Sequence, residues 1–240
     1  MLNVDIDTGG TMTDGLISGD GQMFSVKVET TPHDVTLSFV QVLEAARERV
    51  GAPTLRDFLD RVGLIRWSST ITSNVLAQKT GPKIGLLVSA GNEDTLYGSA
   101  EDAAAVVGTL VARTDITGIA DDADDDTVRI AVKSLFDRGI RRINISLAGA
   151  FPDNSRERRI VSMIDQQYPD HFLGSIPALP ASEILLRPDD KTRTFVSLIN
   201  AYVHPALATT LYRAEETVRV EHGWRGNVLV GHINGGVARI

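Results

Sequence analysis

Hydrophobic and polar residues alternate along the N-terminal segment of the chain. In residues 2–6, the apolar side chains of Leu2, Val4 and Ile6 alternate with polar ones and therefore lie on one face of an extended segment. Further apolar runs follow at 15–17 and 23–28. Turn signals separate these runs, because Gly9-Gly10 follows the first and Gly19-Asp20-Gly21 follows the second. The pattern predicts an antiparallel meander of three strands.

The spacing of apolar residues then becomes helical. From Val35 to Val50 they recur every three or four residues. Asp34 precedes this segment as a predicted N-cap and Gly51 follows it as a predicted end. The N-terminal part of the chain therefore predicts the order β-β-β-α.

Extended and helical patterns alternate through the remaining residues. Such alternation implies crossover connections, so we expect part of the sheet to be parallel and covered by helices. Asn154 and Glu157 form a predicted capping box, and Pro205 is expected to kink or restart a long helix. The predicted strands are 64–67, 84–88, 143–147 and 228–233, and the predicted helices are 55–62, 75–79, 128–136, 154–168 and one that opens within 187–194 and ends near Gly223.

Composition excludes several classes of protein. The 240 residues, of which 42% are hydrophobic and 23% charged, suit one or two packed domains. A net charge of −7 and the lack of a Lys/Arg stripe argue against a nucleic-acid partner. The chain has no cysteine, no apolar run of membrane-spanning length and no signal-like N-terminus, so we expect a cytoplasmic protein without a membrane partner.

The first Gly-Gly turn is the leading candidate for a binding site. Asp7, Thr8, Gly9, Gly10 and Thr11 follow a strand directly. Glycine lets backbone N–H groups approach a phosphate, and an aspartate can hold hydrated Mg²⁺. Glycines in a hairpin also serve simply to make a turn, so the residues alone leave both interpretations open.

Two further polar stretches allow alternative interpretations. Hydroxyl and amide side chains fill residues 68–74, which either cap the helix that follows or form a polar wall of the same cleft. The acidic run 121–126 precedes a helix, and we interpret it as a solvated helix N-terminus rather than as a cation site.

The last predicted strand runs into Asn234-Gly235-Gly236, so the chain ends as it begins, with a strand and a Gly-Gly turn. This repetition indicates a second copy of the unit, with two phosphate loops facing each other across a cleft. We expect a domain over residues 1–225 and the first strand and phosphate turn of an incomplete second domain over 226–240.

The arrangement resembles the actin, Hsp70 and sugar-kinase superfamily, which has a ribonuclease H-like α/β fold. Residues 7–14 look like the opening motif of the hydantoinase A, oxoprolinase and acetone carboxylase family, and residues 69–74 resemble its Thr-rich motif. Residues 187–190, 200–205 and 231–239 look closest to the ATP-binding (beta) subunit of acetone carboxylase. The resemblance implies an α/β domain with a mixed sheet flanked by helices.

The resemblance also implies an ATP-dependent ketone carboxylase subunit, in which ATP activates bicarbonate and the ketone enolate. Its implied catalytic acids are Asp7, which also orients Mg²⁺, and Asp14. The implied nucleotide-binding residues are Gly9, Gly10, Thr11 and Thr13 in the first loop, Thr70, Thr72 and Asn74 in the second motif, and Asn234, Gly235 and Gly236 in the last. Implied partners are a larger hydantoinase B-type catalytic subunit, which would hold any transition metal, and a small third subunit.

Two departures from the family pattern leave alternatives open. Met12 stands where an aromatic residue is common, and the chain ends just after the second Gly-Gly, where family members continue. One alternative is an ATP-dependent hydantoinase or 5-oxoprolinase subunit, since amide activation can use the same phosphate site. The other is a half-domain that serves assembly and does not catalyse.

Overall fold

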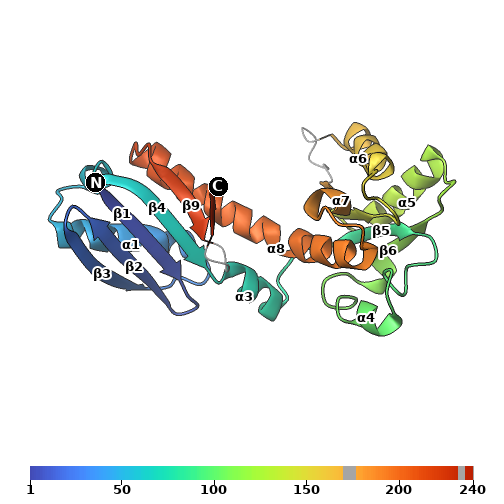
Figure 1. Cartoon of the computed structure of the whole chain (residues 1–240), viewed down its shortest axis with the longest axis horizontal. Helices are drawn as coiled ribbons and strands as arrows, with labels where there is room; N and C mark the ends of the chain where they lie inside the picture. The colour runs from blue at the N-terminus through green and yellow to red at the C-terminus, as the bar shows by residue number, and fades with distance from the viewer. Residues whose placement is uncertain (170–176, 232–235, 240) are drawn as a thin grey trace. The chain divides into compact units, whose positions relative to one another are not determined.

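The computed structural model describes residues 1–169, 177–231 and 236–239. The chain forms two compact units, and we describe each by itself (Figure 1). The first comprises Met1–Ala77 and Ala206–Ile240, and the second comprises Gln78–Pro205.

The first unit is built on a mixed sheet in the order β10-β9-β4-β1-β2-β3. Strands β1, β2 and β3 form the predicted antiparallel meander, whereas β4 is parallel to both β1 and β9. Its strands are β1 (Leu2–Thr8), β2 (Met12–Gly19), β3 (Gln22–Glu29), β4 (Val62–Ser69), β9 (Asn227–Gly231) and β10 (Val237–Arg239). Its helices are α1 (Val35–Val50), α2 (Leu55–Leu59), α3 (Ile71–Gln78, up to Ala77), the end of α8 (Asp190–Glu216) and a π-helical turn, Thr217–Glu221.

Alternation along the strands divides this sheet into an apolar face and a polar face. Leu2, Val4 and Ile6 of β1 are buried in one core cluster with residues of α1, α2 and the last part of α8. Asp5 and Asp7 point to the opposite face. The three helices thus cover one face, and α1 can be followed along it in Figure 1.

Helix α1 begins and ends as its sequence predicts. The Thr36 N–H donates to Asp34 Oδ1 over 3.1 Å, which satisfies one of the free amides of the first turn. Gly51 has a φ of 72°, and its N–H closes the helix on the carbonyl groups of Arg47 and Glu48. This left-handed geometry favours glycine because it has no Cβ.

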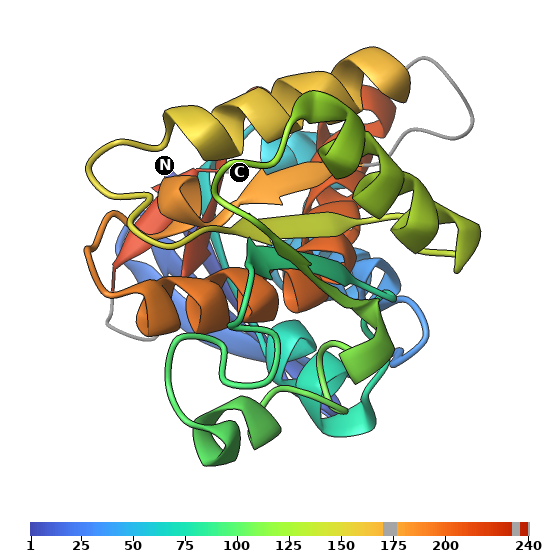
Figure 2. The ribbon, with the colours of Figure 1, turned by 90° about the vertical axis from the view of Figure 1, so that its right-hand side faces the viewer.

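The second unit contains a separate parallel sheet in the order β6-β5-β7-β8. Figure 2 shows α5 and α6 on one side of this sheet and the first part of α8 on the other. Its strands are β5 (Gly85–Ser89), β6 (Ile116–Ile119), β7 (Ile143–Ser146) and β8 (Ala178–Pro180). Its helices are α4 (Ala100–Ala104), a 3₁₀ turn (Arg113–Asp115), α5 (Asp125–Asp137), α6 (Ser155–Gln167), α7 (Ala181–Ile184) and α8 up to Pro205.

Strand β7 is buried on both faces, and the two faces differ in chemistry. Ile143 and Ile145 belong to the apolar core cluster that includes residues of α5 and α6. On the α8 side, the Asn144 amide donates to Ser197 Oγ over 2.8 Å, and the Ser146 and Thr194 hydroxyls lie 2.7 Å apart. Buried polar side chains of this kind stabilise the packing of α8 on β7 because each finds a hydrogen-bond partner across the interface.

The acidic run before α5 has the structure expected of a helix N-terminus. Asp124 accepts from the Thr127 N–H over 2.8 Å, and Asp125 and Asp126 occupy the first turn. The predicted capping box of α6 is wrong, because Asn154 makes no side-chain cap. Glu157 instead points into the core, where it accepts from the backbone N–H of Leu147 (2.8 Å) and of Ser182 (3.1 Å), and burial raises its pKa.

The C-terminal elements also differ from their expected form. Helix α8 runs through Pro205 as one helix, and the division between the two units falls at this residue. Residues 227–231, which we expected to open a second domain, form β9 and pair with β4 in the first sheet. No helix within the described parts of the chain is both long enough and apolar enough to cross a membrane.

Candidate functional site

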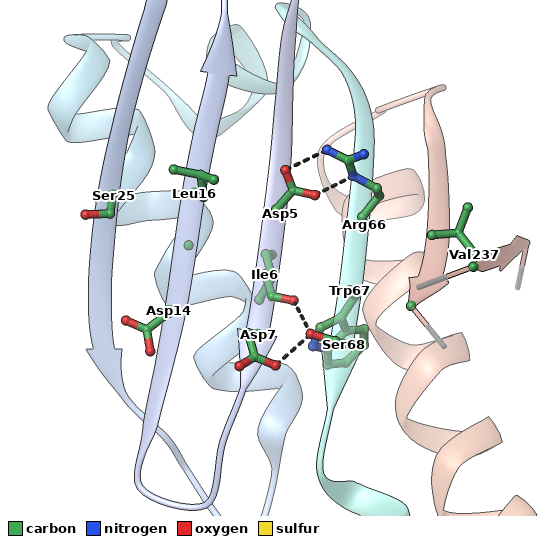
Figure 3. Close-up of a pocket in the computed structure, with 13 residues that line it drawn as sticks. Asp5, Ile6, Asp7, Asp14, Leu16, Ser25, Arg66, Trp67, Ser68 and Val237 are labelled. Atoms are coloured by element: carbon green, nitrogen blue, oxygen red, sulfur yellow. Dashed lines mark hydrogen bonds and ion pairs between the residues drawn. The ribbon is translucent and has the colours of Figure 1, made fainter. Parts of the chain in front are cut away.

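The candidate site lies where three parallel strands of the first unit end. Strands β1, β4 and β9 run in the same direction and end at Thr8, Ser69 and Gly231. Their side chains on the uncovered face border an open groove with a volume of about 430 Å³ (Figure 3). The groove is lined by Asp5, Ile6, Asp7, Asp14, Gly15, Leu16, Ser25, Arg66, Trp67, Ser68, Gly231, Gly236 and Val237.

A row of polar side chains crosses four strands at the end nearest the first Gly-Gly turn. The strand register pairs Lys27 with Asp14, Asp14 with Asp7, and Asp7 with Ser68. Lys27 Nζ lies 2.9 Å from Asp14 Oδ1, and Ser68 Oγ donates to Asp7 Oδ1 over 2.6 Å. The two predicted acids are therefore cross-strand neighbours, and only Asp14 has a cationic partner among the described residues.

A second row lies two residues further from the strand ends. Arg66 grips Asp5 with two hydrogen bonds, of which the one from Nη2 to Oδ2 measures 2.7 Å, and this contact raises the pKa of the Arg66 guanidinium. Leu16 and Ser25 continue the row on β2 and β3. This row is internally neutralised, so the uncompensated negative charge of the groove lies on Asp7.

The first Gly-Gly turn joins the end of β1 to the start of β2, and the described lining of the groove includes none of Gly9, Gly10 and Thr11. The Gly9 N–H donates to the Met12 carbonyl over 3.0 Å, which closes the hairpin. A Cβ added at Gly9 would meet that carbonyl oxygen at 3.1 Å, whereas a Cβ added at Gly10 would meet nothing within 4 Å. Neither glycine has a positive φ. Nothing among the residues that the structure describes therefore requires glycine at position 10, and the backbone there is exposed.

The threonines of the first motif separate into inward and outward positions. Thr13 is fully buried, and its hydroxyl lies 2.9 Å from that of Thr30. Thr8 is also buried and accepts from the Trp67 indole N–H over 2.9 Å. Thr11 is exposed in the turn. The structure thus brings the Thr11 side chain to the surface beside Gly10 and places the Thr13 hydroxyl in the core.

The second polar motif begins helix α3 beside the end of β1. The Thr70 N–H donates to the Thr8 carbonyl over 3.1 Å, and Ser69 Oγ accepts from the Ile71 N–H over 3.1 Å. Thr72 and Asn74 follow within the helix. The capping interpretation therefore holds for Ser69. Thr70 adjoins the candidate site, but the described lining of the groove includes none of Thr70, Thr72 and Asn74.

The second Gly-Gly motif leaves the same edge of the same sheet. A Cβ added at Gly231, the last residue of β9, would lie 3.5 Å from Ser68 Cβ. Gly236 lines the groove, whereas the predicted Asn234 and Gly235 lie outside the described residues. Gly231 and Gly236 of the last motif therefore line the same groove as Asp7 and Asp14 of the first.

The groove suits a metal held jointly by the protein and a ligand. Within the described residues, no group of three or more His, Asp or Glu side chains is placed to hold a metal ion. Mg²⁺ commonly uses only one or two carboxylates, with phosphate oxygens and water as its other ligands. Asp7, exposed and without a cationic partner in the described structure, fits that role.

A Gly10→Ala substitution tests whether the open backbone serves a ligand. We expect folding stability to change by no more than about 0.5 kcal/mol, because the new methyl group lies within 4 Å of no atom of the described residues. We expect affinity for ATP·Mg²⁺ in the assembled protein to fall about tenfold, because the methyl group would stand where the phosphate approaches. Calorimetric titration and thermal unfolding measure the two effects. Unchanged affinity would contradict a phosphate role for Gly10.

Several residues of the site were not identified from the sequence. Ser68 lies within the polar stretch 68–74, but the residues predicted there to bind the nucleotide are Thr70, Thr72 and Asn74. Asp5, Arg66 and Lys27 lack any motif, and only the pairing of β1 with β4 and of β2 with β3 places them beside the predicted acids.

Comparison with known proteins gives a consistent assignment. Residues 3–168 match the family model described as the hydantoinase/oxoprolinase N-terminal region. The chain is 30% identical to the acetophenone carboxylase gamma subunit of Aromatoleum aromaticum over 99% of its own length and 36% of that protein. It is 29% identical to the caprolactamase subunit alpha of Pseudomonas jessenii over 88% of its own length and 32% of that protein.

A solved structure shares the fold. The nucleotide-free structure of acetone carboxylase superposes with a TM-score of 0.84 and 24% sequence identity, over 99% of this chain and 37% of that one. The chain thus spans about a third of the length of the relatives it matches.

Proposed function

Because this chain belongs to the hydantoinase/oxoprolinase N-terminal family, we propose that it is the phosphate-handling part of an ATP-dependent ketone carboxylase subunit. In this proposal ATP transfers phosphoryl groups to bicarbonate and to the enolate of an acetone-like ketone and leaves as ADP. The enol carbon then forms a bond to the carboxyl carbon as the C–O bond of carboxyphosphate breaks and phosphate leaves, and water takes the phosphoryl group from the enol oxygen, which restores the ketone and releases a second phosphate. The carbon chemistry belongs to a partner of the hydantoinase B type. The observation that carries the proposal is the hairpin that joins Asp7, which lines the groove, to the open backbone of Gly10 three residues further along the chain.

The residues of the groove have separate roles in this proposal. Asp7 would hold Mg²⁺, which supplies neutralisation of phosphate charge when bound. The backbone N–H groups of Gly10 and Thr11 would bind phosphate oxygens, since that of Gly9 closes the hairpin. Lys27 neutralises Asp14, so Asp14 adds little to the negative charge beside Asp7. Phosphoryl transfer depends on positioning and charge neutralisation more than on covalent help, so these roles are sufficient.

Lactam hydrolysis is the second candidate. The caprolactamase subunit of similar identity supports it, because amide activation by ATP can use the same phosphate groove. Hydantoin or 5-oxoproline would be substrates of the same class.

Product analysis with the assembled protein tests these proposals. We expect acetone, bicarbonate and ATP to yield acetoacetate, with [¹⁴C]bicarbonate as the tracer. Turnover of caprolactam or 5-oxoproline, with no carboxylation, would replace the first proposal with the second. No consumption of ATP with either substrate class, together with no binding of ATP·Mg²⁺ by calorimetry, would instead support a non-catalytic role in assembly.

A further inference from the structure

Ser68 has contacts that set it apart from Ser25, the other hydroxyl side chain in the described lining of the groove. Its Oγ lies 2.6 Å from Asp7 Oδ1 and 3.3 Å from the Ile6 carbonyl oxygen (Figure 3). A hydroxyl carries one hydrogen, and the shorter distance is that of a charge-assisted bond to a carboxylate. Ser68 therefore donates to Asp7.

The backbone that carries Ser68 is firmly anchored. Ser68 pairs with Asp7 in the parallel ladder between β4 and β1. The preceding residue, Trp67, is buried and packs against Phe39 with ring centroids 4.7 Å apart, while its indole N–H bonds Thr8 Oγ1. The Ser68 hydroxyl is thus presented from a rigid strand, which is the condition for orienting a neighbouring group.

The two acids of the groove are held in different ways. Asp14 is neutralised by Lys27, whereas Asp7 receives a neutral hydroxyl and keeps its full charge within the described structure. Because Ser68 occupies Oδ1, the carboxylate of Asp7 has its other oxygen, Oδ2, left for a ligand. A carboxylate already fixed in one orientation loses less conformational entropy when it binds.

We propose that Ser68 is a positioning residue that holds the Asp7 carboxylate in one rotamer and presents Oδ2 to a divalent cation. This inference rests on the role proposed above for Asp7. It assigns Ser68, rather than the neighbouring threonines, as the residue of the hydroxyl-rich stretch that acts on the site.

The test uses Ser68→Ala, Ser68→Thr and, as a matched control, Ser25→Ala. Ser25 lines the same groove but makes no hydrogen bond to Asp7 among the described residues. Without any ligand, the Hα–Hβ couplings of Asp7 measured by NMR should be unequal in the wild type and in Ser68→Thr, and averaged in Ser68→Ala. Couplings that stay unequal in Ser68→Ala would overturn the positioning role.

Binding of Mn²⁺ alone, followed by electron paramagnetic resonance, provides the second measurement. We expect Ser68→Ala to weaken Mn²⁺ binding about tenfold, and Ser68→Thr and Ser25→Ala to bind as the wild type does. If Asp7→Asn removes binding while Ser68→Ala retains wild-type affinity, the inference about Ser68 fails and the role of Asp7 stands. If Asp7→Asn binds as the wild type does, the proposed metal role of Asp7 itself fails.

Discussion

An Asp7→Asn variant is expected to lose ATP turnover in the assembled protein by about 100-fold or more, since it removes the one groove carboxylate without a cationic partner in the described structure. Asparagine has nearly the same shape as aspartate, and its Oδ1 still accepts a hydrogen bond from Ser68. Folding stability should therefore change by no more than about 0.5 kcal/mol. Initial rates of ADP release and analytical ultracentrifugation of the complex measure turnover and assembly separately.

Asp60→Asn is the matched control for this substitution. Asp60 is also exposed and belongs to the same unit, but it lies just before the start of β4, whereas Asp7 lies near the end of β1. We expect it to leave both turnover and assembly unchanged. Full activity in Asp7→Asn would contradict the proposed phosphate site, and loss of assembly would show that Asp7 has a structural role instead.

An Arg193→Met variant is expected to destabilise the second unit by about 3 kcal/mol. Arg193 is fully buried. It donates to the carbonyls of Arg187 (2.6 Å) and Leu147 (3.2 Å), and it forms an ion pair with Asp190. Methionine fills similar space but has no hydrogen-bond donor, so the two carbonyls and the Asp190 carboxylate lose the bonds that Arg193 makes to them. Asp190 is 25% exposed and still accepts from Gly149, so the cost lies at the lower end of the range for a broken buried pair.

Urea unfolding followed by circular dichroism measures this loss, and amide hydrogen exchange along β7 assigns it to the second unit. Arg158→Met is the control, because Arg158 pairs with Glu183 at the surface over 2.8 Å, with 66% and 44% of the two side chains exposed. A change of no more than about 0.5 kcal/mol is expected there. Equal destabilisation by the two variants would contradict the role assigned to the buried guanidinium.

The Arg193 contacts also explain a motif that the sequence left without a role. Residues 187–190 resemble a family motif, and in the structure they lead into α8, which begins at Asp190. Asp189 accepts from the Thr192 N–H over 2.9 Å, and Asp190 accepts from the Gly149 N–H over 3.1 Å. The motif therefore joins the end of β7 to the helix, and its polar residues serve the fold of the second unit.

Local physics was sufficient for most elements of the fold. Strict alternation in residues 2–28 determined the meander, because only one register buries Val4, Ile6 and Ile17 together. Asp34 and Gly51 determined the ends of α1, because the caps involve residues close in sequence. The resemblance to the family could be recognised in the sequence because the first motif, residues 7–14, is one continuous segment.

Contacts between residues that are distant in the sequence decided the position of Glu157 and of segment 227–231. Glu157 has a capping-box position, yet the tertiary structure turns it toward Leu147 and Ser182, because buried amides there would otherwise lack an acceptor. Segment 227–231 looks like a new first strand, yet its backbone groups find their partners on β4 of the first sheet.

The site shows the same division between local and long-range causes. The sequence by itself determined that Asp7 and Asp14 flank a Gly-Gly turn, because a short hairpin places the residues on its two strands opposite each other. Only the tertiary structure decided that Thr13 faces the core, that Lys27 neutralises Asp14, and that Ser68 holds Asp7. The register between strands set those contacts, and that register depends on the packing of the whole sheet rather than on the residues of the motif.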